Sequence, residues 1–337
     1  MDMRSNIVET KNMSKLSAQD RLDILKSGRF FPVIFPFATL ITIILIFGVA
    51  TGGKFFSKNV FLGIFNQSII VGAIAIGVSY IYSTGDVDIS VGNVMGLAAA
   101  IGALSYQFTT SPVVMILVTI LVAIALMQFN CCLSLAFNVK SAMVAIVAMT
   151  LYSAITTEIV GVDTIKVDYK LCKTLENNGF RYISFLSYLI LSMVVYHATA
   201  LGRKLRFIGG NEVCARQTGM SISVCKVMGF LIAGLGVGLA GVYQIIRSGS
   251  VASSVGQGMG MDVMLATVLG GMSIFGGAKA NAYAGLIGAL TVTALNKGLL
   301  MLDVPTTAIQ GVRAVIFLLL VFLNSERPST LPSKQQF

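Results

Sequence analysis

The feature that most constrains this chain is an uncharged stretch from Ile89 to Val139, which contains no Asp, Glu, Lys, Arg or His. A membrane-spanning helix needs about 20 apolar residues, so this stretch is too long for one span and long enough for two. Two further stretches, Phe30–Gly53 and Asn59–Gly85, also lack charged residues. The sequence therefore predicts an all-α fold, a polytopic membrane bundle of helices.

Composition narrows the possible functions. Charged residues make up 11% of the 337 residues, whereas soluble domains have about 25%. This excludes a soluble enzyme, a disordered chain and a nucleic-acid partner. The chain has one histidine, His197, and five cysteines without a CxxC pair. We therefore expect no metal site, no disulfide framework and no catalytic residue in this chain.

About ten spans are expected, some of them broken, at residues 31–51, 60–82, 89–105, 112–137, 141–160, 182–199, 227–246, 261–275, 281–301 and 308–324. With both termini in the cytoplasm, the inner segments hold about twice as many Lys and Arg as the outer ones, as the positive-inside rule requires. The predicted domains are a cytoplasmic tail (1–29), a transmembrane domain (30–325) and a second cytoplasmic tail (326–337).

Two glycine-rich segments interrupt the apolar runs. The first, Ser83–Gly92, contains two acidic residues, and the second covers Gly256–Gly277. Glycine lets the backbone leave a helix, and Asp or Ser can cap the next one. We expect breaks or gates here, and a simple capped turn is the alternative. The residues assigned to this role are Gly85, Gly92, Asp262, Gly270, Gly271, Gly276 and Gly277.

The inner loop 203–222 is basic and contains a short helical stretch, Glu212–Thr218, with glycines on both sides. Such a helix can dock into a groove on a partner protein. A solvated connector is the alternative.

Three segments resemble one family. DVDISVGNVMGL, FIGGNEVCARQTGMSI and GQGMGMDVMLATVLGGMSIFGGAKA are similar, in order and spacing, to motifs of the permease subunits of bacterial ABC importers for ribose, xylose, galactose and related sugars. The resemblance implies that a second permease subunit, a cytoplasmic ATPase that holds ATP and Mg, an extracytoplasmic sugar-binding protein and membrane lipid are the partners. It implies no cofactor bound by this chain and a location in the inner membrane.

The resemblance also implies roles for single residues. The coupling loop, 203–222, would contact the ATPase through Gly209, Gly210, Asn211, Glu212, Ala215, Arg216 and Gly219. Polar residues within spans are candidates for the translocation path, because a hydroxylated solute can exchange hydrogen bonds with them. They are Asn66, Gln67, Asn93 and Asn296, with Gln128 and Asn130 as further polar residues. The resemblance adds Asp88 and Ser90, which would lie at the break near the path. Hydrogen bonding between helices is the alternative for each.

The chain departs from the family pattern at several positions. Val213 stands where the family usually has Glu, Asp86 and Lys279 where it tends to have Gly, and Lys140-Ser141-Ala142 where it has Thr-Pro-Phe. Because of these departures, the resemblance does not identify the transported solute or the ATPase that pairs with this chain.

The chain contains no complete ATP-binding loop. The stretch Gly48–Lys54 nearly fits the Walker A pattern, but Phe55 replaces the hydroxyl residue that would reach Mg²⁺. ATP hydrolysis is therefore expected on another polypeptide. A nucleoside or an autoinducer-2-type signal is an alternative solute. An ion-coupled secondary transporter, with Asp88 or Glu158 as the coupling group, and an intramembrane enzyme are alternative classes.

Overall fold

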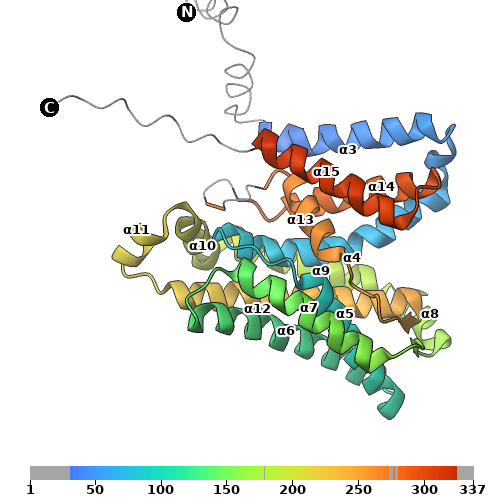
Figure 1. Cartoon of the computed structure of the whole chain (residues 1–337), viewed down its shortest axis with the longest axis horizontal. Helices are drawn as coiled ribbons and strands as arrows, with labels where there is room; N and C mark the ends of the chain where they lie inside the picture. The colour runs from blue at the N-terminus through green and yellow to red at the C-terminus, as the bar shows by residue number, and fades with distance from the viewer. Residues whose placement is uncertain (1–30, 178, 273–275, 278–279, 325–337) are drawn as a thin grey trace, which may run out of the picture.

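The computed structural model describes residues 31–177, 179–272, 276–277 and 280–324. The two predicted tails, 1–29 and 326–337, lie outside the described residues. Within the described part, the chain is a bundle of α-helices with one pair of two-residue strands (Figure 1). The predicted all-α membrane bundle is confirmed.

In the described part of the chain, nine helices have 18 residues or more. They are α3 (Phe31–Ala50), α4 (Lys58–Ser83), α5 (Val91–Thr109), α6 (Pro112–Ala136), α7 (Ser141–Val160), α9 (Phe180–Ala198), α12 (Ile222–Ser248), α14 (Ala284–Met301) and α15 (Thr306–Asn324). The shorter elements are η1 (Lys54–Phe56), β1 (Ile165–Lys166), α8 (Tyr169–Asn177), α10 (Ala200–Gly210), α11 (Glu212–Gln217), β2 (Ser250–Val251) and α13 (Met259–Leu269).

Seven helices among the described residues are long and apolar enough to cross a membrane. Three shorter apolar stretches, Pro36–Ala50, Met259–Leu269 and Ala308–Leu318, lie at the positions of the other predicted spans. The prediction of a full span at 261–275 is wrong. Helix α13 has 11 residues, about 16 Å of helix, which is half the thickness of a bilayer core of about 30 Å.

Glycines set both limits of α13. Gly258, just before the helix, has φ +75°, and Gly271, just after it, has φ +86°. A left-handed backbone is accessible to glycine at little steric cost, so the helix can end at these points. Residues 273–275 of the predicted span lie outside the described residues.

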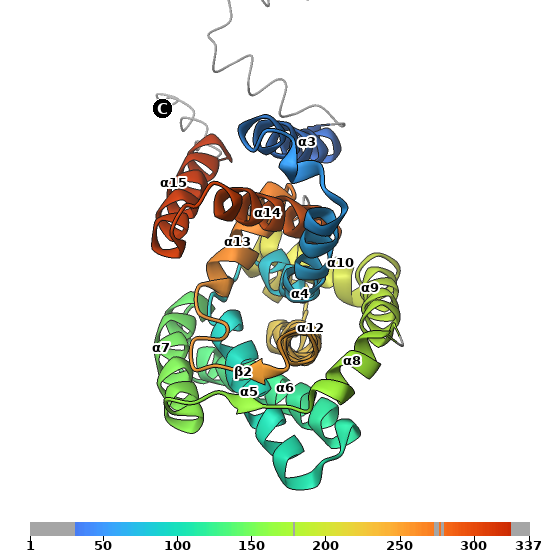
Figure 2. The same cartoon turned by 90° about the vertical axis from the view of Figure 1, so that its right-hand side faces the viewer.

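Helices α4 and α12 form the centre of the bundle. Helices α3, α14 and α15 lie to one side of α4, while α6 and α7 lie on the far side of α12 (Figures 1 and 2). Small residues allow this close packing. A Cβ at Gly238 of α12 would lie 2.7 Å from Cα of Ile120 in α6, and one at Gly234 would lie 2.8 Å from Cα of Ile124.

The two ends of the bundle differ. Helices α10 and α11 form one end, and α8 lies at the other (Figure 1). Near α8, β1 pairs antiparallel with β2, with Ile165 opposite Val251. This pairing joins the α7–α8 connection to the α12–α13 connection. The predicted spans leave room for both connections and for the loop 203–222, but the sequence did not predict the strand pair or helix α10.

Candidate functional site

The first helix break is the non-helical segment 84–90 between α4 and α5. Gly85 starts it with φ +79°. Near its end, Oδ1 of Asp88 accepts hydrogen bonds from the backbone N–H of Ser90 at 2.8 Å and from its Oγ at 2.6 Å. The Asp88 carboxylate therefore holds the backbone in the turn that leads into α5. The N-cap residue of α5 is Ser90, and its side chain makes no capping hydrogen bond to the described backbone.

The second break is the segment 252–258 between β2 and α13. Gly256 and Gly258 have φ of +86° and +75°. Figure 1 shows that α13, which follows this segment, lies between the two ends of the bundle. Non-helical backbone at membrane depth is tolerated where protein covers it, and here the start of α5 provides part of that cover.

The two breaks touch each other. A Cβ atom added at Gly92 would clash with the carbonyl oxygen of Gly256, and one added at Gly260 would clash with the carbonyl oxygen of Ile89. The backbones approach so closely that only glycine fits at these positions. The N-terminal ends of α5 and α13 are thereby brought together inside the bundle, and each carries a buried acidic residue, Asp88 or Asp262.

The carboxylate of Asp88 belongs to a hydrogen-bonded group that joins three helices. Asn130 of α6 donates from Nδ2 to Oγ of Ser90 at 2.9 Å and to Oδ2 of Asp88 at 3.4 Å. Tyr152 of α7 donates its hydroxyl to Oδ1 of Asn130 at 2.7 Å. All four side chains are buried. The network fixes the start of α5 against α6 and α7.

The carboxylate of Asp262 belongs to a second group. Nη1 of Arg313, on α15, lies 2.6 Å from Oδ1 of Asp262, and Nε of Arg313 donates to Oδ1 of Asn296 at 2.8 Å. Asn296 of α14 in turn donates to Oδ2 of Asp262 at 3.4 Å. The Arg313 side chain retains 19% of its exposure and the Asp262 side chain 12%, but Oδ1 of Asp262, the oxygen that Arg313 contacts, is buried.

A third polar group lies near α8. Arg181 of α9 is 1% exposed, and its Nη2 donates to Oδ1 of Asn66 at 2.9 Å and to the hydroxyl of Tyr182 at 3.1 Å. The same nitrogen lies 3.3 Å from Oε1 of Glu176. Arg181 thus joins α4, α8 and α9 at the end of the bundle opposite α11.

The coupling loop begins with α10, which packs against the end of α4. A Cβ at Gly209 would meet the carbonyl oxygen of Ser83 and lie 2.7 Å from the nitrogen of Gly277. Ser83 directly precedes the first break, and Gly277 lies in the connection between α13 and α14, where its N–H donates to the carbonyl of Ser83 at 3.2 Å. Helix α10 therefore contacts chain segments next to both α5 and α13.

Helix α11 extends from this contact. Asn211 caps it by accepting a hydrogen bond from the N–H of Cys214 at 3.0 Å, and Gly219, with φ +77°, follows its C-terminal end. Glu212 and Arg216 form an exposed pair at 3.4 Å, while Ala215 is buried. The predicted helical stretch is confirmed over Glu212–Gln217. Its polar side chains remain free to contact another protein.

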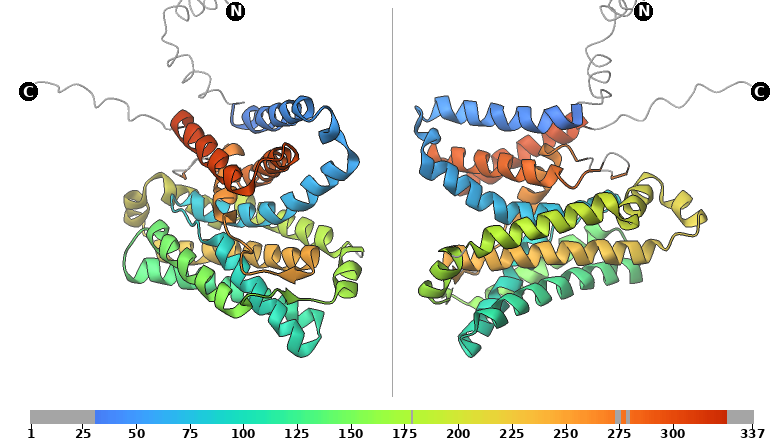
Figure 3. Two further views of the ribbon diagram at one scale, coloured as in Figure 1. Left: turned by 45° about the vertical axis from the view of Figure 1, so that its right-hand side comes forward. Right: turned by 180° about the vertical axis from the view of Figure 1, so that it is seen from behind.

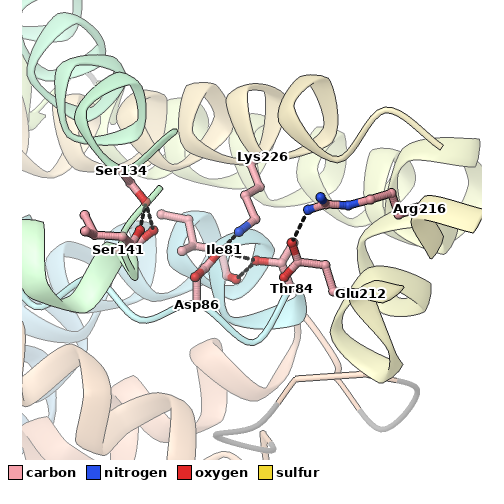
Figure 4. A network of polar contacts seen from close by, with 9 residues as sticks. Ile81, Thr84, Asp86, Ser134, Ser141, Glu212, Arg216 and Lys226 are labelled. Carbon is pink, nitrogen blue, oxygen red and sulfur yellow. Dashed lines mark hydrogen bonds and ion pairs between the residues drawn. The ribbon is translucent and has the colours of Figure 1, made fainter. Parts of the chain in front are cut away.

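An ion pair lies between the coupling loop and the first break (Figure 4). Nζ of Lys226, in the first turns of α12, lies 2.8 Å from Oδ2 of Asp86. The hydroxyl of Thr84 donates to the same oxygen at 3.3 Å. The pair fixes the start of α12 to the segment 84–90.

The predicted path residues do not form one cluster. Asn66 lies with Arg181, Asp88 and Ser90 with Asn130, and Asn296 with Asp262. Gln67 is half-buried and Asn93 is buried, and neither side chain has a hydrogen bond among the described residues. Their assignment to a path stays a prediction.

The predicted break residues take different positions. Gly85, Gly271, Gly276 and Gly277 have positive φ outside the helices. Gly92 instead lies in the first turn of α5, where it permits the close approach together with Gly260 of α13, which the sequence did not assign to a break. A Cβ at Gly270 would meet the carbonyl of Ala284. Their role in gating stays a prediction.

Sequence reasoning missed several partners. Each polar group or ion pair described above contains a residue that the sequence did not predict as a partner, namely Tyr152, Arg181, Lys226 or Arg313. A buried acidic residue indicates that a partner exists, but the sequence does not identify that partner. Among the described residues, no group of three or more His, Cys, Asp or Glu could hold a metal ion.

Comparisons with known proteins agree with this architecture. A family model described as "Branched-chain amino acid transport system / permease component" matches residues 60–323. The ribose import permease protein of Escherichia coli K12 is 26% identical over 81% of this chain and 88% of its own length. The autoinducer 2 import system permease protein of Photorhabdus laumondii is 26% identical over 79% and 82%. The xylose transport system permease protein of E. coli K12 is 25% identical over 86% and 90%. No solved structure matches the chain.

Proposed function

This chain belongs to the family of branched-chain amino acid transport system permease components, and from that premise we propose that it moves a small sugar across the inner membrane, driven by ATP hydrolysis on partner subunits. Its relatives are permease subunits of sugar importers, and a permease component is not itself a catalytic enzyme. The partners proposed are a second permease subunit, a cytoplasmic ABC ATPase and an extracytoplasmic binding protein.

The observation that carries this proposal is the packing of α10 between the exposed helix α11 on one side and, on the other, the end of α4 and the connection that follows α13. Helix α10 contacts Ser83, next to the first break, and Gly277, beyond α13. Tyr196, in the last turn of α9, adds hydrogen bonds to Oγ of Ser83 at 2.6 Å and to the carbonyl of Ala280 at 3.0 Å. A force applied to α11 would therefore act at once on the segment that leads into α5 and on the connection that leads out of α13.

The mechanism proposed is alternating access. Closure of the ATPases would push on α11, and α10 would transmit that movement to the short helix α13 and the start of α5. These elements meet inside the bundle, where discontinuous helices of transporters commonly form the solute site. In this proposal α11 and both termini face the cytoplasm, since the inner segments carry the excess of Lys and Arg.

The test is uptake by the full transporter. The chain is co-expressed with the ATPase and the binding protein encoded by its neighbouring genes. Entry of radiolabelled D-ribose into intact cells is then measured with and without ATP depletion. We expect uptake to stop when ATP is depleted and to survive a proton ionophore at fixed ATP. Uptake that survives ATP depletion and stops with the ionophore would instead indicate an ion-coupled secondary transporter.

A second solute class has a specific observation in its favour. One relative is an autoinducer 2 import system permease, with the same identity to this chain as the ribose permease of E. coli K12. A competition assay decides between them: excess autoinducer 2, a nucleoside or unlabelled ribose is added to the uptake assay. The compound that blocks labelled uptake at the lowest concentration identifies the solute class.

A further inference from the structure

Helix α10 has one buried, apolar side. Its buried residues are Gly202, Leu205 and Ile208, and because they recur every three residues they lie along one side of the helix. Leu205 and Ile208 belong to the same apolar cluster as Tyr80 of α4 and Ile222 of α12. This side therefore holds α10 against the bundle, at the end where α11 lies (Figure 1).

The opposite side of α10 is basic. Arg203, Lys204 and Phe207 are exposed. Residues three or four apart share one side of a helix, so these three form one surface, which we call the outer face of α10. Arg206 is half-buried beside it. The helix contains no acidic residue, and Glu212, the next one along the chain, pairs within α11. Among the described residues, no cation of α10 forms an ion pair.

Helix α9 carries an apolar surface up to the start of α10. Ile190 and Val194 are exposed, and the other large exposed side chains between residues 183 and 194 are apolar as well. Ala198, four residues after Val194, is exposed on the same side and ends the helix. Figure 3 shows α9 at the surface of the bundle when the molecule is seen from behind, with the chain continuing into α10 at the end where α11 lies. Such an apolar surface is satisfied by lipid tails.

The outer face of α10 begins where this apolar surface ends. Nη1 of Arg203 donates a hydrogen bond to the carbonyl of Ala198 at 3.3 Å, so its guanidinium lies at the last exposed residue of α9. Helix α12, which also contacts α10, exposes Val224 and Met228 in its first two turns. Apolar surface thus reaches α10 from both neighbouring helices. The basic residues of α10 therefore lie at the level where acyl chains give way to headgroups.

We propose that the outer face of α10 binds the headgroups of anionic phospholipids. Basic residues next to a membrane attract anionic headgroups, and a guanidinium can donate two hydrogen bonds to one phosphate while an ammonium acts as a point charge. Phe207 is 46% exposed, and an aromatic ring beside basic residues is typical of the boundary between headgroups and acyl chains. The bound lipids hold α10 at the membrane surface, beside α11. This inference does not depend on the transported solute.

Fluorescence quenching by brominated lipids tests the proposal. The chain contains no tryptophan, so a single introduced indole reports on its own surroundings. The full chain with Phe207→Trp is reconstituted into mixtures of phosphatidylcholine and phosphatidylglycerol, with the acyl chains of one lipid or the other brominated. We expect a relative binding constant of about five or more in favour of phosphatidylglycerol, since each basic residue near the headgroups contributes about five-fold. Ile190→Trp on α9 is the matched control, and the two brominated lipids should quench it equally.

Two pairs of charge substitutions separate the outer face from the overall charge of the chain. Arg203→Gln combined with Lys204→Gln, in the Phe207→Trp background, should bring the relative binding constant to about one, because the cations that bind the headgroups are gone. Lys170→Gln combined with Lys173→Gln removes the same charge from the exposed side of α8, at the other end of the bundle. This control pair should leave the preference unchanged.

Several results would overturn the proposal. Absence of quenching of Phe207→Trp by either lipid would place the outer face in water, and loss of quenching on addition of the ATPase would assign the face to that protein. Equal quenching by both lipids, or a preference that survives the substitution of Arg203 and Lys204, would exclude selective binding of anionic lipid. Loss of the preference on addition of inorganic phosphate would indicate a site for free phosphate. No transport is measured, so this inference and the proposed function fail independently.

Discussion

Nζ of Lys226 lies 2.8 Å from Oδ2 of Asp86, with the two side chains 14% and 7% exposed. This ion pair fixes the start of α12, directly after the coupling loop, to the first break. Asp86 stands where the family that the sequence resembles tends to have glycine, so the pair is an addition to that pattern. It lies beside the contact through which α10 reaches Ser83.

Removing one member of this pair should destabilise the protein more than removing both. Asp86→Ala or Lys226→Met leaves a buried charge without its partner, which costs about 3–5 kcal/mol. The double variant leaves no such charge and should recover most of that loss. Thermal unfolding of the four proteins in detergent measures the coupling. Additive losses in the double variant would show that the two charges do not interact.

The contact between the two breaks predicts a difference between two glycines. Gly92→Ala would push a methyl group into the carbonyl of Gly256, and such overpacking costs about 1–3 kcal/mol. Gly63 of α4 has nothing within 4 Å of its Cβ position, so Gly63→Ala should stabilise its helix by about 0.5–1 kcal/mol. Unfolding midpoints in urea-containing detergent compare the two, and equal effects would contradict the close contact.

Adjacent glycines in α10 offer a test of coupling. Gly209→Ala should separate α10 from Ser83 and Gly277, whereas Gly210→Ala meets nothing within 4 Å. If α10 transmits movement, Gly209→Ala should reduce solute uptake per ATP hydrolysed and Gly210→Ala should keep it. Both rates are measured in the same proteoliposomes. An unchanged ratio for Gly209→Ala would remove α10 from the proposed mechanism.

The Asp88 network predicts graded losses. Tyr152→Phe removes one donor to Asn130 and should cost about 0.5–1.5 kcal/mol. Asn130→Leu leaves Asp88 without its amide donor and the Tyr152 hydroxyl without its acceptor, so its cost should be larger, about 1–3 kcal/mol or more. Thr150→Val on the exposed side of α7 is the control and should change stability by less than about 0.5 kcal/mol. The reverse order would contradict the network.

Two native cysteines should differ in reactivity. Cys214 of α11 is exposed, whereas Cys172 of α8 is buried. Burial, with Asp168 nearby, raises the pKa of the Cys172 thiol above its ordinary value, and the thiolate is the reactive form. With the protein in detergent, where the reagent reaches both ends of the bundle, a membrane-impermeant maleimide at pH 7.5 should label Cys214 quickly and Cys172 slowly. Labelling of Cys172 should accelerate as the pH rises above 9, and on denaturation.

The same reagent tests the orientation. If α11 faces the cytoplasm, Cys214 is labelled in inside-out vesicles and protected in intact cells. Cys214→Ser controls for background labelling. Rapid labelling of Cys214 from the exterior of intact cells would contradict the proposed topology.

Hydrophobicity and local chemistry determined much of this protein. The spans could be predicted because an apolar run of about 20 residues satisfies its own backbone hydrogen bonds whatever surrounds it. The breaks around Gly85 and Gly258, the turn held by Asp88 and the helix at Glu212–Gln217 also follow from residues close together in the chain.

The tertiary structure decided which polar residues meet. Asn130 reaches Asp88 across 42 residues of chain, and Arg313 reaches Asn296 across the α14–α15 connection. The sequence predicts that a buried charge has a partner, but several polar residues at similar depth are equally suitable, and only helix packing selects one. The position of α13 was decided in the same way: local glycines permit the helix to end where it does, but only tertiary packing brings the start of α5 against the backbone before it.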